Sequence, residues 1–174
     1  FPWLTKELET RGFQVVTPEL PDASSPRIHT WVPTIAAAIG QPDDQTYFVG
    51  HSMGCQAIAR YLETLPIGIV VGGAVFVAGF FRRLEGLTDD LEERTTEHHW
   101  LGTELDLAKV KIHLRKSVAI FSDDDPWVPL DNQDDFREKL GSEIILEHGL
   151  KHFNTAAGIL ELPSARDAIL RLAA

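Results

Sequence analysis

The run Gly50-His51-Ser52-Met53-Gly54 places one serine between two glycines at the spacing Gly-x-Ser-x-Gly. A serine hydroxyl that sits on a sharp turn between a strand and a helix can act as the nucleophile of acyl transfer. Such a turn leaves no room for a Cβ two positions before or after the serine, so glycine or a very small residue is needed there. The alternative is an ordinary turn whose serine only caps the following helix.

The flanks of this pentapeptide favour the nucleophile. Residues 45–49 form a short β-branched and aromatic run that predicts a buried strand. Residues 55–63 carry apolar side chains at the spacing of one helical face. A Gly-x-Ser-x-Gly between a strand and a helix is the setting of a nucleophile elbow, in which the serine has a strained backbone. We therefore expect Ser52 to be the nucleophile and the backbone N–H of Met53 to be a donor of the oxyanion hole.

A serine nucleophile needs a base, and the base needs an orienting carboxylate. Sheets that carry this elbow supply the three in the chain order Ser, Asp or Glu, His. Residues 117–121 predict a strand that nearby prolines end, so the three aspartates that follow lie in a loop at its carboxyl end. Asp123 and Asp124 are interpreted as a solvated acidic turn. Asp125, in an Asp-x-x-Val-Pro arrangement, is the predicted orienting acid.

Two histidines follow the next predicted strand, residues 143–147. A lone histidine is more often structural than catalytic. His152, however, lies in the loop after that strand and before the C-terminal helices, which is the required place in the order. It is the predicted general base, and His148, closer to the strand end, is the weaker candidate.

Six segments that together span nearly the whole chain resemble a known family. They are Trp3-Leu-Thr-Lys-Glu-Leu-Glu9, Leu20-Pro-Asp22, Trp31-Val-Pro33, Val49-Gly-His-Ser-Met-Gly54, Asp124-Asp-Pro-Trp-Val-Pro129 and Gly149-Leu-Lys-His-Phe-Asn154. In these segments the chain is similar to the α/β-hydrolases of the retinoblastoma-binding protein 9 family, whose bacterial members are the small YdeN-like serine hydrolases. The resemblance implies Ser52 as nucleophile, Asp125 as orienting acid and His152 as base, the triad that the residues themselves suggest.

Members of that family begin with a strand and a glycine-rich loop, and the loop contributes one backbone N–H to the oxyanion hole. The present sequence starts at Phe1, which we interpret as lying inside the first helix. We expect the first strand to be absent from this chain, and with it the second oxyanion donor, which would come from the upstream loop.

Composition bounds the class of protein. With 174 residues, 44% of them hydrophobic and 24% charged, the chain has the size and composition of one globular domain, residues 1–174. Its formal net charge of −10 argues against nucleic acid and anionic membrane surfaces as partners. The longest apolar run, residues 67–81, is too short to span a bilayer. The single cysteine, Cys55, favours a reducing compartment, hence the cytoplasm, and is interpreted as a packing residue.

Strands that alternate with helices predict a doubly wound, mostly parallel sheet of the α/β-hydrolase type. Besides the strands and the elbow helix above, the sequence predicts helices at 3–10, 27–39, 106–112, 131–140 and 164–172 and strands at 13–17 and 74–78. Residues 79–115 break the alternation and are interpreted either as a small cap over the carboxyl edge of the sheet or as a long crossover connection.

Five residues are predicted to bind substrate. If residues 79–115 form a cap, Phe80, Phe81 and Trp100 would be walls of the pocket. Trp127, beside the predicted acid, and His51, beside the predicted nucleophile, complete the set.

The sequence thus predicts a carboxylesterase-like serine hydrolase that cleaves a small ester, thioester or amide through an acyl-enzyme. Its partner would be a small acyl substrate, and it would need no cofactor and no metal. The alternative is a non-catalytic protein-binding module on a hydrolase fold, because fold does not fix function and the similar family is named for a protein partner. A metal site built from His98-His99, from His148 with His152, or from residues 123–125 is disfavoured, since Gly149 interrupts any helix that would align His148 with His152.

Overall fold

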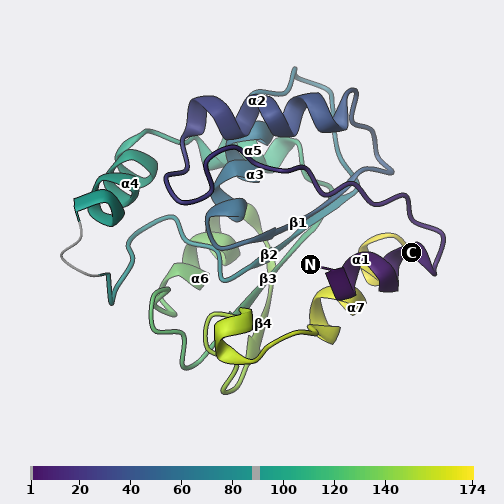
Figure 1. Ribbon diagram of the computed structural model, residues 1–174. Coiled ribbons are helices and arrows are strands. Elements are labelled where there is room, and N and C mark those ends of the chain that lie inside the picture. Colours follow the sequence, from purple (N-terminus) through teal and green to yellow (C-terminus); the bar gives the residue numbers. More distant parts are fainter. Residues whose placement is uncertain (1, 88–90) are drawn as a thin grey trace.

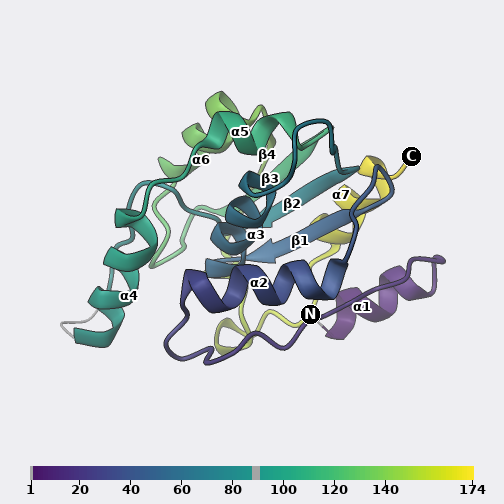
Figure 2. The same ribbon diagram turned by 90° about the horizontal axis from the view of Figure 1, so that it is seen from above.

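A four-stranded parallel sheet with helices on both faces forms the centre of the molecule (Figures 1 and 2). The computed structural model describes residues 2–87 and 91–174. The strands are β1 (Tyr47–His51), β2 (Gly73–Val77), β3 (Ser117–Ser122) and β4 (Glu143–Glu147), and they lie side by side in that order. β2 and β3 are buried along their whole length, which fits their unbroken runs of apolar and small residues.

Strands that follow one another in sequence order, joined by right-handed crossovers, send all their connecting helices to one face. That face carries α3 (Met53–Glu63), α5 (Leu107–Ile112), α6 (Asn132–Asp134) and the π-helical turn that continues α6 (Asp135–Leu140), with α2 (Ile28–Ile39) packed beside α3. The opposite face carries α1 (Pro2–Glu9) and α7 (Pro163–Leu172). A short 3₁₀ turn (Thr155–Ala157) lies between β4 and α7. The predicted doubly wound parallel sheet is confirmed.

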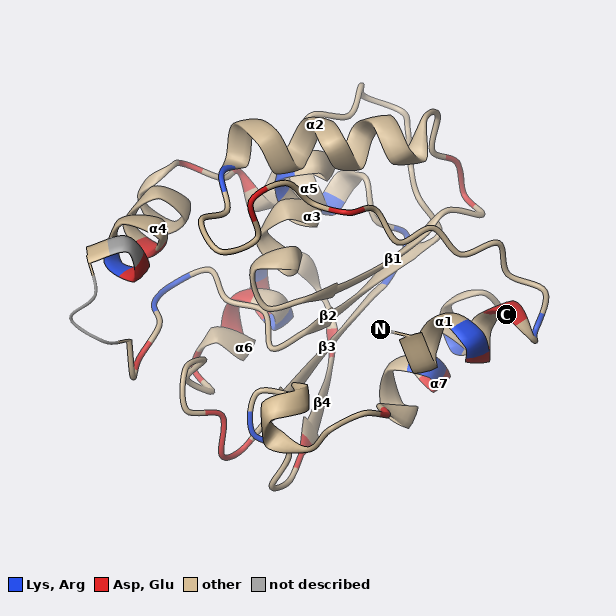
Figure 3. Cartoon of the chain, in the orientation of Figure 1, with Lys and Arg blue, Asp and Glu red and all other residues tan. Residues whose placement is uncertain are grey.

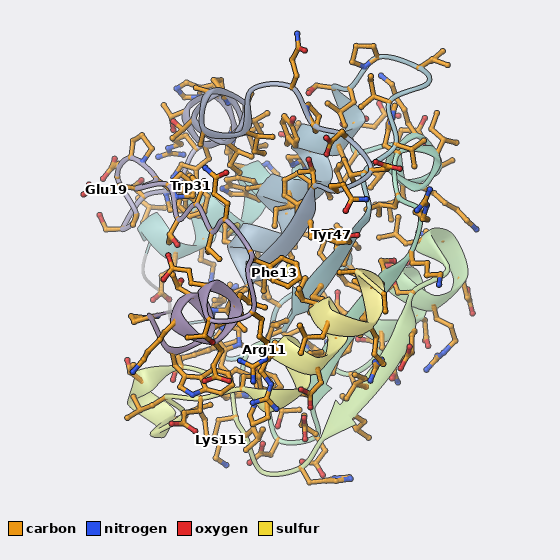
Figure 4. The ribbon with its side chains drawn as sticks, turned by 90° about the vertical axis from the view of Figure 1, so that its right-hand side faces the viewer. Arg11, Phe13, Glu19, Trp31, Tyr47 and Lys151 are labelled. Carbon is orange, nitrogen blue, oxygen red and sulfur yellow. The ribbon has the colours of Figure 1, made fainter. Side chains whose placement is uncertain are left out.

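One predicted strand is wrong. Residues 13–17 form no strand, although the Phe13 ring packs edge-on against Tyr47 at 6.3 Å between ring centroids (Figure 4). A β-branched run becomes a strand only when its backbone shares hydrogen bonds with a neighbour, and in the described part of the chain this segment pairs with none. It instead runs as an extended connection toward α2 (Figure 1).

The region predicted as a cap or a crossover contains α4 (Leu91–Gly102) and α5; its residues 88–90 lie outside the described residues. α4 lies at the end of the molecule toward which β1 and β2 point (Figure 2). Arg60 of α3 holds it there, because its guanidinium donates to the carbonyl oxygen of Trp100 in the last turn of α4 and to those of Thr103 and Glu104 just after the helix. These carbonyls have no partner within the helix, so the contact satisfies them.

Lys, Arg, Asp and Glu side chains lie on the helices, the connections and β4, and β1, β2 and β3 carry none (Figure 3). Within the described residues, no helix is both long and apolar enough to cross a bilayer.

Candidate active site

The predicted elbow has the geometry of a strained turn. β1 ends at His51, α3 begins at Met53, and Ser52 between them has φ 53° and ψ −121°. L-residues rarely adopt positive φ, so surrounding contacts must hold it. The Ser52 N–H donates to the carbonyl of Val77 at 2.9 Å, and its carbonyl accepts from the N–H of Cys55 at 2.9 Å. The Ser52 side chain makes no capping hydrogen bond with the described residues, which disfavours the helix-cap interpretation.

The two elbow glycines differ in what surrounds them. A Cβ on Gly50 would lie 2.8 Å from Ile58 Cδ1 and 2.9 Å from the backbone nitrogen of Cys55, so strand and helix approach too closely for any side chain. Outside its chain neighbours and the backbone of its own helix, a Cβ on Gly54 would meet no described atom within 4 Å. The steric requirement predicted for both glycines therefore applies at Gly50 and not at Gly54.

The predicted acid and base contact each other. Nδ1 of His152 donates to Oδ2 of Asp125 at 2.8 Å, and both side chains are almost fully buried. The second carboxylate oxygen, Oδ1, accepts from the backbone N–H groups of Trp127 and Val128 at 2.9 and 3.1 Å. One oxygen of Asp125 thus fixes its own loop and the other fixes the imidazole. With its proton on Nδ1, His152 leaves Nε2 free to accept a proton.

His51 brings the base next to the elbow. Its Nε2 donates to the backbone carbonyl of His152 at 2.7 Å, and the two rings lie 4.8 Å apart between centroids. Burial, and then the neighbouring His152, lower the pKa of His51 to about 4, so the ring is neutral at neutral pH. The sequence predicts that His51 binds substrate. In the structure its Nε2 instead donates to the loop that carries His152. No hydrogen bond joins Ser52 to His152 in residues 2–87 and 91–174.

Asp123 and Asp124 form a turn after β3, with Asp123 exposed and Asp124 partly exposed, as the interpretation of a solvated turn expects; both also bind the loop after β4. Asp123 accepts from Nδ1 of His148 at 2.6 Å and from the backbone N–H of Gly149 at 3.0 Å. Asp124 accepts from the backbone N–H and the Nζ of Lys151 at 2.8 and 2.7 Å. The partners lie more than twenty residues away in sequence, so only the pairing of β3 with β4 reveals them.

These bonds shift the titration of the groups that make them. The hydrogen bond from His148 lowers the pKa of Asp123, and the same bond raises the pKa of His148. Hydrogen bonds from Lys151 and then Ser122 lower the pKa of Asp124 to about 2. Asp124 is therefore a carboxylate throughout the range in which a hydrolase of this kind would work.

The aromatic residues predicted as pocket walls divide into two groups. Phe80 and Trp100 are fully buried, and Phe81 stacks on Phe136 at 4.5 Å between centroids. Phe80 and Trp100 are therefore not accessible to a substrate, whereas Phe81 is only partly buried. Trp127 is 37% exposed and meets the His152 ring edge-on at 4.8 Å, so it is the one of the four that lies at the predicted base.

A groove of about 450 Å³ runs beside β1, between that strand and the helices α1 and α7. His51, Val77 and Phe153 line its end nearest the elbow. Ser52 and the four predicted aromatic residues are not among its lining residues.

The remaining predictions concern the oxyanion donor, metals and the cysteine. Met53 is the first residue of α3, so its N–H has no intrahelical partner and is free to donate. In the described part of the chain, no three His, Cys, Asp or Glu side chains gather as a metal site. Cys55 is buried, and burial raises the pKa of its thiol. It is a packing residue, as predicted.

Comparison with known families decides the class of this protein. A family model described as serine hydrolase matches residues 1–171. The chain belongs to the serine hydrolase family. It is a hydrolase with the α/β fold that its sheet displays.

Individual members of the family agree with this. YdeN of Bacillus subtilis (strain 168), named as a hydrolase, is 30% identical over 172 residues, which cover 97% of this chain and 85% of YdeN. The serine hydrolase RBBP9 of Rattus norvegicus is 24% identical over 88% of this chain and 77% of its own length. The crystal structure of the B. subtilis ydeN gene product superposes with a TM-score of 0.88 over 99% of this chain and 89% of that one, at 27% identity. The predicted resemblance is confirmed.

Proposed function

We propose that this serine hydrolase cleaves a small carboxylic ester through an acyl-enzyme, with Ser52 as nucleophile, His152 as base and Asp125 as orienting acid; thioesters and amides are the related substrates. The observation that carries the proposal is the buried 2.8 Å bond between Asp125 and Nδ1 of His152, together with the strained backbone of Ser52, whose neighbour His51 binds the carbonyl of His152. These are the three parts of a triad in the chain order that this elbow requires.

The chemistry follows from the free nitrogen of the imidazole. Nε2 of His152 takes the hydroxyl proton of Ser52 as Oγ bonds to the substrate carbonyl carbon. The same nitrogen then gives that proton to the leaving alcohol oxygen as the C–O bond breaks. A water molecule, deprotonated by His152, then attacks the acyl carbon. The bond between that carbon and Oγ breaks, His152 returns the proton to Oγ of Ser52, and the acid is released. Asp125 keeps the imidazole in the required tautomer and stabilises the imidazolium.

The negative charge that develops on the carbonyl oxygen needs hydrogen-bond donors. The N–H of Met53 lies next to the nucleophile at the N-terminus of α3, where the helix dipole also favours negative charge. One such donor contributes about 10²- to 10³-fold in kcat.

Structures of similar fold include a carboxylesterase of the thaumarchaeon Nitrososphaera gargenis, with a TM-score of 0.68 and 11% identity, and the esterase domain of a Rhodothermus marinus protein, with a TM-score of 0.61 and 13% identity. At this identity they share the fold only. They support an ester as the first substrate class to test.

The test is covalent labelling of the purified protein with a fluorophosphonate probe, alongside Ser52→Ala and turnover of p-nitrophenyl acetate. We expect labelling and turnover in the wild type, and in Ser52→Ala no labelling and a loss of turnover of about 10⁴-fold or more. Labelling that persists in Ser52→Ala would assign the reactive group elsewhere. Absence of labelling in the wild type would overturn the proposal and favour a binding role on this fold.

A further inference from the structure

His152 sits between two residues with unusual backbone. Lys151 has φ 51° and Phe153 has φ 53°, and neither is a glycine. L-residues avoid this left-handed region because the Cβ crowds the backbone, so two such residues in one loop need contacts that hold them. The loop after β4 therefore does not adopt this shape from its own sequence preferences.

Two residues at the end of β3 supply those contacts. Asp124 Oδ1 accepts from the backbone N–H of Lys151 at 2.8 Å and from Ser122 Oγ at 2.8 Å. Ser122 Oγ in turn accepts from the backbone N–H of Leu150 at 3.0 Å. The two residues directly before His152 thus have their N–H groups bound by one connected pair of side chains. Ser122 itself is buried.

The ion pair between the side chains of Asp124 and Lys151 contributes less to the shape of the loop than the hydrogen bond from the Lys151 backbone N–H does. The Lys151 side chain is 56% exposed and its residue lies at the surface (Figure 4), where ion pairs are screened by water and salt. The backbone N–H bond, in contrast, acts directly on the strained residue. Its removal frees the Lys151 backbone to return to a relaxed conformation, and this would turn His152.

We propose that Asp124 is a positioning residue of the active site: by binding the N–H of left-handed Lys151 it sets the place of the His152 imidazole against Asp125 and the nucleophile. The inference rests on the proposed function for its kinetic consequence. Asp125 fixes which nitrogen of the imidazole is protonated, and Asp124 fixes where the imidazole lies. The two neighbouring aspartates therefore act on the same histidine in different ways.

The test compares Asp124→Ala with Asp123→Ala, its neighbour in the same loop, which loses the same charge but binds only the exposed His148 and Gly149. With p-nitrophenyl acetate we expect Asp124→Ala to lose about 10-fold in kcat with little change in KM, because the position of the base affects the chemical step. Asp123→Ala should stay within twofold of the wild type. Equal losses in the two variants would overturn the proposal.

A second change separates positioning from general stability. Glycine adopts φ 51° without strain, so Lys151→Gly combined with Asp124→Ala should recover several-fold of the lost kcat. Asp124→Asn, which keeps one oxygen as acceptor, should retain more activity than Asp124→Ala and covers the case in which the alanine variant fails to fold. If neither the double variant nor Asp124→Asn has a higher kcat than Asp124→Ala, Asp124 has only a structural role.

A readout without turnover keeps the inference distinct from the proposed function. The proton between Nδ1 of His152 and Asp125 should give a downfield ¹H NMR signal in the wild type and in Asp123→Ala, and that signal should broaden or vanish in Asp124→Ala. The signal can follow this pattern in the three proteins while the wild type is neither labelled nor active on the ester. In that case positioning by Asp124 stands and the catalytic proposal falls. An unchanged signal in Asp124→Ala would reject the positioning role.

Discussion

The elbow and the loop that carries His152 both contain non-glycine residues with positive φ, but these residues are held by different means. At the elbow, Ser52 is held within a few residues of sequence, by the close approach at Gly50 and the start of α3, together with one bond to β2. In the loop after β4, Lys151 and Phe153 lie on either side of His152. The bonds that hold this loop come from other strands: from Ser122, Asp124 and Asp125 at the end of β3 and after it, and from His51 at the end of β1.

The elbow is thus organised mainly by residues near in sequence, and the loop of His152 by residues far away in sequence. An elbow built by neighbouring residues forms whenever its strand and helix form, so its pattern is visible in the sequence. A loop held by side chains of another strand takes its shape only when β3 and β4 are paired in the observed register. Changes at the elbow should therefore affect packing first, and changes in the loops should affect chemistry first.

The largest effect that this comparison predicts is at Asp125. Asp125→Asn should keep the bonds from Trp127 and Val128 to Oδ1 but present an N–H to His152, which forces the wrong tautomer on the imidazole. We expect kcat for p-nitrophenyl acetate to fall by about 10⁴-fold with an unchanged fold. Steady-state kinetics with circular dichroism measure both. A loss below tenfold would mean that the carboxylate does not orient the base.

The elbow should respond through stability, and unequally at its two glycines. Gly50→Ala would force a Cβ against Ile58 and Cys55, and should lower the free energy of unfolding by about 1–3 kcal/mol. Gly54→Ala, the matched control within α3, meets open space among the described residues and replaces glycine by a better helix former, so it should cause no loss. Urea unfolding of both variants gives the comparison. Equal destabilisation would show that both glycines face the same steric limit.

The stability of the fold should depend on pH through His51, which joins the elbow to the loop of His152. His51 bonds the carbonyl of His152, and its pKa is lowered from 6.5 to about 4 in the folded chain. Between these values the unfolded chain binds a proton that the folded chain excludes, so the stability of the fold should rise as pH rises from about 4 to 6.5 and fall on acidification. The slope of unfolding free energy against pH measures this. His51→Gln, which keeps an N–H donor and does not titrate, should flatten that slope; an unchanged slope would assign the dependence to other groups.

The smallest effect is expected at Cys55, one residue past Gly54. Its thiol is fully buried and its pKa is raised by that burial, so little thiolate forms. A thiol reagent such as dithionitrobenzoate should leave the native protein unmodified and its activity unchanged, and should titrate one thiol after unfolding. Rapid reaction of the native protein would show that the packing around the elbow helix opens readily.

Sequence patterns predicted most of the fold and the triad candidates. The strand at residues 143–147 and the helix of the elbow were predicted with bounds close to those observed, because period and apolar runs are local properties. The strand at 13–17 was wrong, since its β-branched residues satisfy the local preference but find no hydrogen-bonding neighbour in the described chain. Trp100 shows the same limit, because an aromatic residue in a charged segment gives no sign of whether it faces a substrate or, as here, packs on Trp31.

The order Ser52, Asp125, His152 and the strained elbow were determined by the sequence alone, because glycines, a strand run and a helix run act over a few residues. The roles of His51 and Asp124 were decided only by the tertiary structure. Each binds the backbone of a loop about 101 or 27 residues away, and a backbone carbonyl or N–H has no side-chain identity that a sequence could display. The register of four parallel strands brings these groups together, and that register is a property of the whole sheet.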